Sequence, residues 1–245
     1  MDQIWIGMLA TGGCTALGAV PALFFNNVSH RIKDILLAYT AGIMVAASTN
    51  SLIPSALEMS NLAVLSIGVI TGTLLLMILE HFIPHMDLEH TSGRPMQRIE
   101  RSTLLFVTAM ALHNLPEGLS VGVSFASEDD QLGSLVSFAI GLQNIPEGAL
   151  IAFFLISRSV SRWYAFIFSA ITGLIELLSF LIGFYFSQSI AGIVPYGLAF
   201  AAGAMLFVVY KELIPESHGD GHARSATFSF IVGLLTMIIL SNTLG

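Results

Sequence analysis

The chain has 245 residues, of which 55% are hydrophobic and only 10% are charged, and its mean hydropathy is +0.82. A soluble domain carries roughly 25% charged residues, so the composition excludes an aqueous globular fold and indicates a lipid bilayer as the solvent. The net charge of −7 argues against a nucleic-acid partner, because nucleic acids bind basic surfaces.

A helix needs about 20 apolar residues to cross the hydrocarbon core of a bilayer. Eight such windows predict an all-α integral membrane protein, with residues 1–245 forming a single domain. The windows cover residues 4–25, 35–57, 61–79, 102–125, 131–157, 163–187, 189–210 and 225–244. The fourth, fifth and sixth windows carry one glutamate each, and the others carry no charged residue. Ionised side chains inside a bilayer are costly and usually functional, so these glutamates mark a candidate site.

The basic residues predict the orientation of the chain. With eight helices both termini lie on one side, and all nine Lys and Arg residues then fall on the other. The terminal side instead carries the acids Asp2, Glu58, Glu128, Asp129 and Asp130. By the positive-inside rule the basic side is cytoplasmic. We therefore expect a multi-pass protein of the cell membrane with both termini outside and a cytoplasmic loop at residues 85–101.

An internal repeat links the windows at an offset of 161 residues. The recurring segments are Thr11-Gly12 with Thr172-Gly173, Gly42-Ile43-Met44 with Gly203-Ala204-Met205, Leu52-Ile53-Pro54 with Leu213-Ile214-Pro215, and Gly72 with Gly233. Helices one to three therefore correspond to helices six to eight, in inverted topology. Helices four and five form a second inverted pair, which gives a three-plus-two-plus-three plan. Secondary transporters often have this plan, with the site near the bilayer midplane.

Two related hexapeptides lie near the middle of the fourth and fifth windows. They are His113-Asn114-Leu115-Pro116-Glu117-Gly118 and Gln143-Asn144-Ile145-Pro146-Glu147-Gly148. Because positions i and i+4 share a helix face, His113 should lie over Glu117 and Gln143 over Glu147. Two glutamates that face each other in a low dielectric repel, and a divalent cation between them removes the conflict. Imidazole, carboxylate and amide ligands suit a first-row divalent ion such as Zn²⁺.

Two residues from other windows are further candidates for this cation site. Glu176, in the sixth window, is a third intramembrane acid, and Met44, in the second, could supply a soft thioether. A lone buried methionine is more often a packing residue, and a lone histidine is more often a satisfied core residue. The two Pro-Glu motifs together with a third acid nevertheless favour a cation site.

A second polar group is predicted at the cytoplasmic face. Its members are Glu80, His81, His85, Asp87, Glu89 and His90 after the third helix, and Glu212, Glu216, His218, Asp220 and His222 after the seventh. The pairs His81/His85 and His218/His222 have i,i+4 spacing. The group is either a solvated acidic surface or a weak relay or sensing site for released metal.

With these motifs, the chain resembles the ZIP (Zrt-, Irt-like protein) family of divalent metal transporters, in particular its prokaryotic branch. The resemblance rests on HNLPEG, QNIPEG and the eight-helix plan. It implies a binuclear site in which one metal takes Met44, His113, Glu117, Gln143 and Glu147, and the other takes Asn114, Asn144 and Glu176, with Glu117 and Glu147 bridging. It also implies a homodimer, an elevator-like movement and influx of Zn²⁺, with Cd²⁺, Fe²⁺, Mn²⁺ and Co²⁺ as further candidate substrates.

The chain departs from the family pattern at two positions. Many members have His where this chain has Gln143, and some have His beside the acid where this chain has Lys211-Glu212. An amide is the weaker ligand, so the first departure bears on metal affinity and preference. The second departure weakens a relay of metal through the cytoplasmic group.

A transporter, and no enzyme, is thus the expected function. The alternative is an intramembrane metal-dependent hydrolase, which normally holds its metal through three protein ligands and an activated water. The HExxH motif is absent, and His113 is the only histidine inside a predicted span. A third interpretation, a metal-sensing receptor, finds no soluble effector domain in the sequence.

Overall fold

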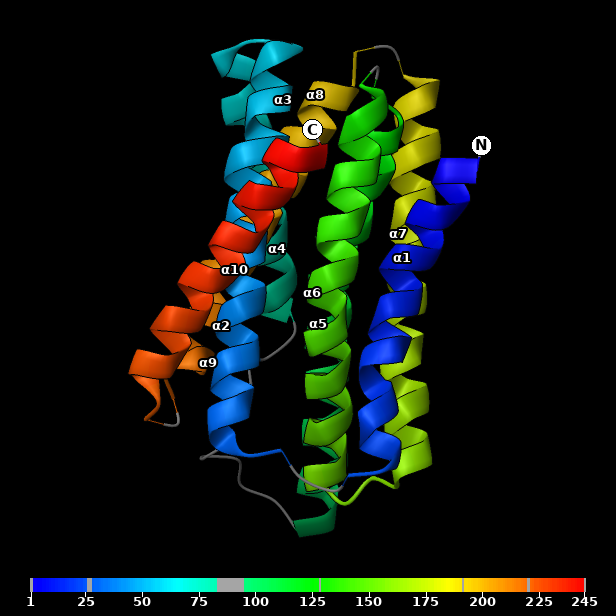
Figure 1. The fold of residues 1–245 in the computed structure, drawn as a ribbon. Helices are drawn as coiled ribbons and strands as arrows, with labels where there is room; N and C mark the ends of the chain where they lie inside the picture. Colours follow the sequence, from blue (N-terminus) through cyan, green and yellow to red (C-terminus); the bar gives the residue numbers. More distant parts are fainter. Residues whose placement is uncertain are drawn as a thin grey trace.

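The computed structural model describes residues 2–25, 28–82, 95–127, 129–190, 192–219 and 221–244, and Figure 1 shows them as a bundle of long helices. These residues contain no strand, so the all-α prediction is confirmed for them. The elements are α1 (Asp2–Ala19), η1 (Val20–Leu23), α2 (His30–Ala47), η2 (Ser48–Leu52), α3 (Ile53–Glu58), α4 (Leu62–Phe82), α5 (Pro95–Phe125), α6 (Asp130–Ser157), α7 (Arg162–Ser189), α8 (Val194–Val208), η3 (Val209–Leu213), α9 (Ile214–Ser217) and α10 (Ala223–Leu244).

Seven helical runs within the described residues are long and apolar enough to cross a membrane. They are Ile4–Leu23, His30–Glu58, Leu62–His81, Gln131–Ser157, Arg162–Ser189, Val194–Ser217 and Ala223–Thr243. The chain is therefore a multi-pass membrane protein. Helix α5 is not among the seven. It nevertheless packs along α6, α7 and α8 inside the bundle (Figure 1).

Two helices begin earlier than the apolar windows predict, because a helix continues beyond its apolar stretch into polar surroundings. Helix α2 begins at His30, where the side chain of Ser29 caps it by accepting from the N–H of Ile32. Asp34 thus lies inside the helix. Helix α5 begins at Pro95, so residues 95–101 of the predicted loop are helical. The rest of that loop, residues 85–94, lies outside the described residues.

Two π-helical turns interrupt the runs His30–Glu58 and Val194–Ser217 at matching positions. They are η2 and η3, whose bounds differ by 161 residues at both ends, and each directly precedes an Ile-Pro pair. A proline removes an N–H group and clashes with the carbonyl four residues back. The backbone widens instead, so the N–H of Ile53 bonds to the carbonyl of Ser48 and that of Ile214 to the carbonyl of Val209. The hydropathy pattern did not predict these turns.

The repeated glycines lie where helices cross most closely. A Cβ at Gly42 would clash with the carbonyl of Phe230, and one at Gly203 would clash with that of Val69. Val69 and Phe230 are themselves 161 residues apart. The contact of α2 with α10 is thus matched by the contact of α8 with α4. Small residues allow this close approach between helices in a membrane.

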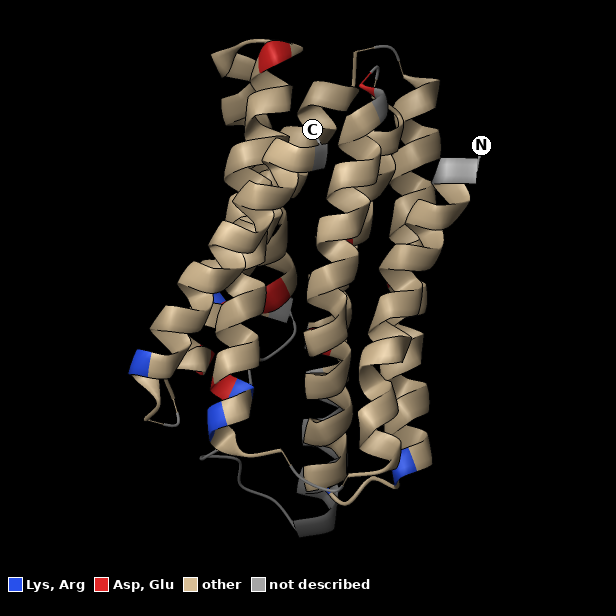
Figure 2. Cartoon of the chain, viewed as in Figure 1, with Lys and Arg blue, Asp and Glu red and all other residues tan. Residues whose placement is uncertain are grey.

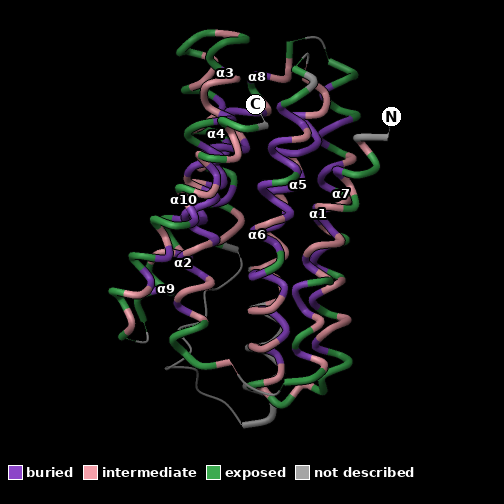
Figure 3. The backbone as a smooth tube through the Cα atoms, viewed as in Figure 1, coloured by how far each residue is buried: buried purple, intermediate pink, exposed green. Residues whose placement is uncertain are grey.

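Polar and apolar residues are distributed as a bilayer requires. Figure 2 shows the described Lys and Arg from about mid-height of the bundle downward, whereas the labelled chain ends lie in the upper half. Figure 3 shows buried residues on the inner faces of the helices and exposed residues on the outer faces. Outer helices such as α4 expose large apolar side chains, among them Ile67, Ile70 and Leu74. Such faces suit contact with lipid tails.

Candidate metal centre

All eight residues predicted for the metal site are buried. They are Met44 on α2, His113, Asn114 and Glu117 on α5, Gln143, Asn144 and Glu147 on α6, and Glu176 on α7, and none is more than 6% exposed. Helices α5 and α6 pack against each other and continue through Pro116 and Pro146. The structure therefore gathers three carboxyl groups, three amides and an imidazole in the interior of an apolar bundle, which is an expensive arrangement.

A hydrogen bond joins the two hexapeptides. Gln143 Nε2 donates to Glu117 Oε1 at 2.5 Å. This bond uses the amide N–H and one carboxylate oxygen. The remaining atoms, Gln143 Oε1 and Glu117 Oε2, are buried without a hydrogen-bond partner within the described part of the chain.

Glu176 is held more completely. Asn144 Nδ2 lies 2.7 Å from Glu176 Oε1 and 2.8 Å from Oε2, and the hydroxyl of Thr15 donates to Oε2 at 3.5 Å. Thr15, on α1, was not a predicted site residue. The repeat could have pointed to it, because residue 15 corresponds to residue 176 at the offset of 161. The contact between these two residues thus lies between the two matched halves.

The two asparagines are fixed to backbone carbonyls of neighbouring helices. Asn114 Nδ2 donates to the carbonyl of Thr172 at 3.0 Å, and Asn144 Nδ2 donates to that of Thr11 at 3.0 Å. Thr11 and Thr172 are again 161 residues apart. Because a carbonyl can only accept, each amide must present its nitrogen to it. The oxygen Oδ1 of each asparagine is thereby turned away from that carbonyl, and both oxygens are buried.

Buried polar atoms normally have a hydrogen-bond partner, so exceptions need an explanation. Seven atoms of the two hexapeptides are such exceptions among the described residues: His113 Nδ1 and Nε2, Asn114 Oδ1, Glu117 Oε2, Gln143 Oε1, Asn144 Oδ1 and Glu147 Oε1. The five oxygens can only accept, unless a carboxyl group is protonated. A group of buried acceptors without donors is what a bound cation would satisfy.

His113 also contacts a residue that was not predicted for the site. Its Nε2 lies 2.8 Å from Glu212 Oε2 on η3, and both side chains are largely buried. This is a close ion-pair contact, and neither ring nitrogen of His113 has a hydrogen-bond partner within the described residues. Sequence analysis assigned Glu212 to the cytoplasmic group, because nothing in the linear pattern indicates that η3 lies beside α5.

Within the described residues, no three His, Cys, Asp or Glu side chains are arranged so that they could hold a metal ion together. The bonds above give the reason. His113 faces Glu212, and both oxygens of Glu176 accept from Asn144. Besides His and Glu side chains, the predicted ligand sets therefore need amide oxygens and the thioether of Met44.

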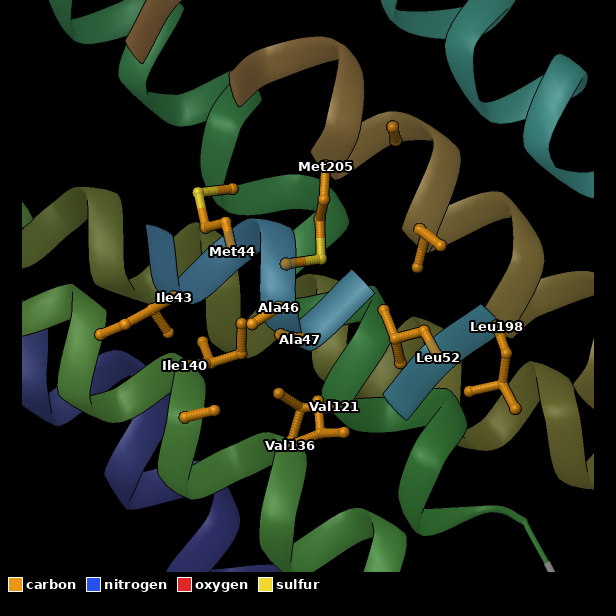
Figure 4. Packing of buried hydrophobic residues seen from close by; sticks show 14 of the residues in the cluster. Ile43, Met44, Ala46, Ala47, Leu52, Val121, Val136, Ile140, Leu198 and Met205 are labelled. Atoms are coloured by element: carbon orange, nitrogen blue, oxygen red, sulfur yellow. The ribbon is translucent and has the colours of Figure 1, made fainter. Parts of the chain in front are cut away.

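Met44 belongs to an apolar cluster that lies beside the polar centre. Figure 4 shows Met44 close to Met205, its counterpart in the repeat, with Val121, Val136 and Ile140 packed nearby. Along α6, Val136 and Ile140 precede Gln143, and along α5, Val121 follows Glu117. Val121, Val136 and Ile140 thus lie on the side of the hexapeptides that leads toward the chain termini, whereas other members of the cluster, such as Val209 and Leu213, lie beside Glu212.

The predicted cytoplasmic group forms separate pairs. Lys211 Nζ lies 3.4 Å from Glu80 Oε1, Lys33 Nζ lies 3.1 Å from Glu216 Oε1, and His222 Nδ1 lies 3.1 Å from Asp34 Oδ2. The His218 ring contacts its own helix end, at Ile214 and Ser217. His85, Asp87, Glu89, His90 and Asp220 lie outside the described residues.

Asp34 is the buried acid that sequence analysis missed. Its side chain is 0% exposed, and Oδ1 has no hydrogen-bond partner within the described residues. The apolar windows excluded it because a window ends at the first charge. His222 was noted only for its spacing from His218, and the structure joins it to Asp34 across 188 positions.

The protein thus belongs to the class of multi-pass membrane proteins with a polar site at membrane depth. Its apolar helices surround a buried group of carboxyl, amide and imidazole side chains. Comparison with known proteins identifies the family. The family described as ZIP Zinc transporter matches residues 83–241. The chain belongs to this family, as its motifs predicted, and the family is one of transporters.

Curated relatives match over nearly the whole chain. "Zinc transporter ZIPB" of Bordetella bronchiseptica is 37% identical over 267 residues, which cover 100% of this chain and 84% of the relative. "Zinc transporter GufA" of Myxococcus xanthus is 36% identical over 250 residues, covering 98% of both chains. "Zinc transporter ZupT" of Stenotrophomonas maltophilia is 27% identical over 258 residues, covering 97% of this chain and 95% of the relative. These relatives are prokaryotic, in agreement with the predicted branch.

Proposed function

We propose that this protein carries divalent metal ions across the membrane into the cytoplasm, with Zn²⁺ as the principal substrate. The observation that carries the proposal is the group of five buried oxygens and two imidazole nitrogens without hydrogen-bond partners in the two hexapeptides. Membership of the ZIP family and the names of the relatives above, which are zinc transporters, support the same substrate. Cd²⁺, Fe²⁺, Mn²⁺ and Co²⁺ are further candidates, because oxygen and imidazole ligands accept them too.

The proposed site holds two metal ions. The first is bound by Met44, His113, Glu117, Gln143 and Glu147, and the second by Asn114, Asn144 and Glu176, with Glu117 and Glu147 bridging. The buried oxygens of the three amides and the open oxygens of Glu117 and Glu147 support this assignment. Glu176 must exchange hydrogen bonds from Asn144 for metal, so we expect the second ion to bind more weakly than the first.

Eight spans in a three-plus-two-plus-three plan are the proposed membrane topology. The proposal counts α5 as a span, because it runs beside α6 and α7 and its polar residues are buried. The matched π-turns and glycine crossings support inverted repeats. The basic end of the bundle is then cytoplasmic by the positive-inside rule, and both termini lie outside.

In this conformation the site faces the cytoplasm. Apolar side chains of Met44, Met205, Val136 and Ile140 separate it from the outer end and offer no oxygen or nitrogen ligand to a hydrated ion. Toward the basic end it meets the polar pair of His113 and Glu212. Transport then requires a second conformation in which the site is open to the outside. We propose that an elevator-like movement within a homodimer interconverts the two conformations.

No observation favours the hydrolase alternative. The family to which this chain belongs is one of transporters. A hydrolytic metal normally has three protein ligands and an activated water.

The test is uptake of ⁶⁵Zn²⁺ into proteoliposomes. Wild type should carry zinc, Glu117→Gln should lose nearly all uptake, and Ser124→Ala, a matched change of a buried residue on the same helix, should retain it. Ser124 is a suitable control because its hydroxyl bonds only within α5, to the carbonyl of Ser120. Uptake by folded Glu117→Gln at the wild-type rate would contradict the proposed site.

A further inference from the structure

The π-turn η3 directs two consecutive side chains to two different helices. Glu212 reaches α5, where it lies 2.8 Å from His113, and Lys211 reaches α4, where its Nζ lies 3.4 Å from Glu80. Two adjacent residues of η3 are therefore linked to an acid-binding contact at the candidate site and to an acid near the end of α4, and the Lys211 ammonium lies on the second of these acids. The Glu80 side chain is 17% exposed and the Lys211 side chain 51% exposed.

Glu212 contacts the candidate site through His113, and Glu80 is paired with the neighbouring residue of η3. We therefore take an ion that leaves the site past His113 to meet Glu212 first and the more exposed Glu80 next. Carboxylates along such a path attract a divalent ion and can retain it. The Lys211 ammonium already pairs with Glu80. Unlike a free cation, it is covalently attached to the chain, so dilution cannot remove it.

We propose that Lys211 occupies, on Glu80, the position that a departing metal ion would otherwise take, and thereby prevents retention of the ion at the cytoplasmic mouth of the carrier. The fixed positive charge also repels a divalent ion that approaches Glu212 from the cytoplasm. Lys211 is thus a residue that sets the rate of release and limits rebinding. The inference rests on the proposed function, since it assumes that metal leaves at the basic end.

The charge of Lys211 can be tested separately from the length of its side chain. Lys211→Met keeps the length of the side chain and removes the charge, whereas Lys211→Arg keeps the charge. Lys211→Gln is a second neutral variant in case the methionine variant is recovered poorly. The double variant Glu80→Gln/Lys211→Met removes the acid as well. Each protein is purified in detergent, and the Zn²⁺ bound per chain is measured by equilibrium dialysis.

We expect the neutral variants to bind one more Zn²⁺ per chain than wild type and to release zinc to a chelator several-fold more slowly. The double variant should return to the wild-type count, and Lys211→Arg should equal wild type. An unchanged zinc count and release rate in both neutral variants would overturn the inference. So would an additional zinc that persists in the double variant, because Glu80 would then not be its ligand.

Failure of this inference can be told apart from failure of the proposed function. Zinc binding is measured on solubilised protein and needs no transport. If wild type carried no zinc into liposomes, the carrier proposal would fail while the added zinc of Lys211→Met remained measurable. If wild type carried zinc and the neutral variants bound no more than it did, only the role of Lys211 would be rejected.

Discussion

Gln143 uses its N–H group to bind Glu117 Oε1 across the contact of α5 and α6, and so leaves its own oxygen and Glu117 Oε2 for another partner. One amide therefore orients the carboxylate and also offers a ligand. In a metal-bound site the same bond would restrict Glu117 to coordination through a single oxygen. The residue at position 143 thus affects the geometry of two ligands.

Replacement of Gln143 by His should shift metal preference toward Zn²⁺. Imidazole is the better ligand for Zn²⁺, whereas Mn²⁺ accepts oxygen ligands readily. We expect the ratio of Zn²⁺ to Mn²⁺ uptake to rise about tenfold, by analogy with the effect of groups that orient ligands. The gain should fade as the pH drops through about 6.5, because a protonated imidazole cannot bind metal. Uptake of both ions between about pH 5.5 and 7.5 measures this, and a constant ratio would remove Gln143 from the ligand set.

The three acids should differ in importance. Glu117→Ala and Glu147→Ala should each nearly abolish zinc uptake, because each removes an open carboxylate oxygen from the proposed first site. Glu176→Ala should reduce uptake less, since its oxygens accept from Asn144 and Thr15. It should instead destabilise the fold by about 1–3 kcal/mol, because the buried N–H of Asn144 loses an acceptor. Uptake and thermal denaturation of the same preparations separate the two effects, and equal loss of uptake in all three would contradict the ranking.

The proposed topology predicts opposite labelling at the two ends of α7. Ser159 and Ser189 are exposed and lie near the beginning and the end of this helix. In a Cys14→Ser background, an impermeant thiol reagent should label Ser189→Cys from outside intact cells. Ser159→Cys should react only after the cells are opened. Labelling of Ser159→Cys in intact cells would invert the proposed orientation.

Two glycines of α1 should respond differently to alanine. A Cβ at Gly18 would clash with the backbone carbonyl of Ile145 on α6, next to Pro146, whereas a Cβ at Gly13 meets nothing within 4 Å. Gly18→Ala should cost about 1–3 kcal/mol through overpacking, and Gly13→Ala should be neutral or stabilise by up to about 1 kcal/mol. Thermal unfolding in detergent compares them. Equal melting temperatures would mean that α1 and α6 do not pack as closely as described.

The features that could be predicted from the sequence are those that a local sequence pattern determines. Apolar stretches indicated the helices, and the repeated Pro-Glu hexapeptides indicated six polar residues that the structure buries, of which Gln143 and Glu117 are in direct contact. The roles assigned to them as ligands remain predictions. The π-turns were not predicted, although the repeated Leu-Ile-Pro carries the physical signal for them.

Contacts between segments that are distant in the sequence could not be predicted from local sequence patterns. Nothing in the order of residues placed Glu212 against His113 or His222 against Asp34, because these contacts depend on how complete helices pack. The direction of each amide was likewise not predictable. It depends on which carbonyl of a neighbouring helix lies within reach, as for Asn114 at Thr172.

The attachment of Asn114 and Asn144 to main-chain carbonyls affects how the site tolerates mutation. The carbonyls of Thr172 and Thr11 remain whichever side chain occupies those positions. Changes of these two side chains that preserve the helices should therefore leave the asparagine oxygens in place. Their direction is determined by helix packing, so a displacement of α1 or α7 would alter the ligand geometry more than a substitution beside the asparagines.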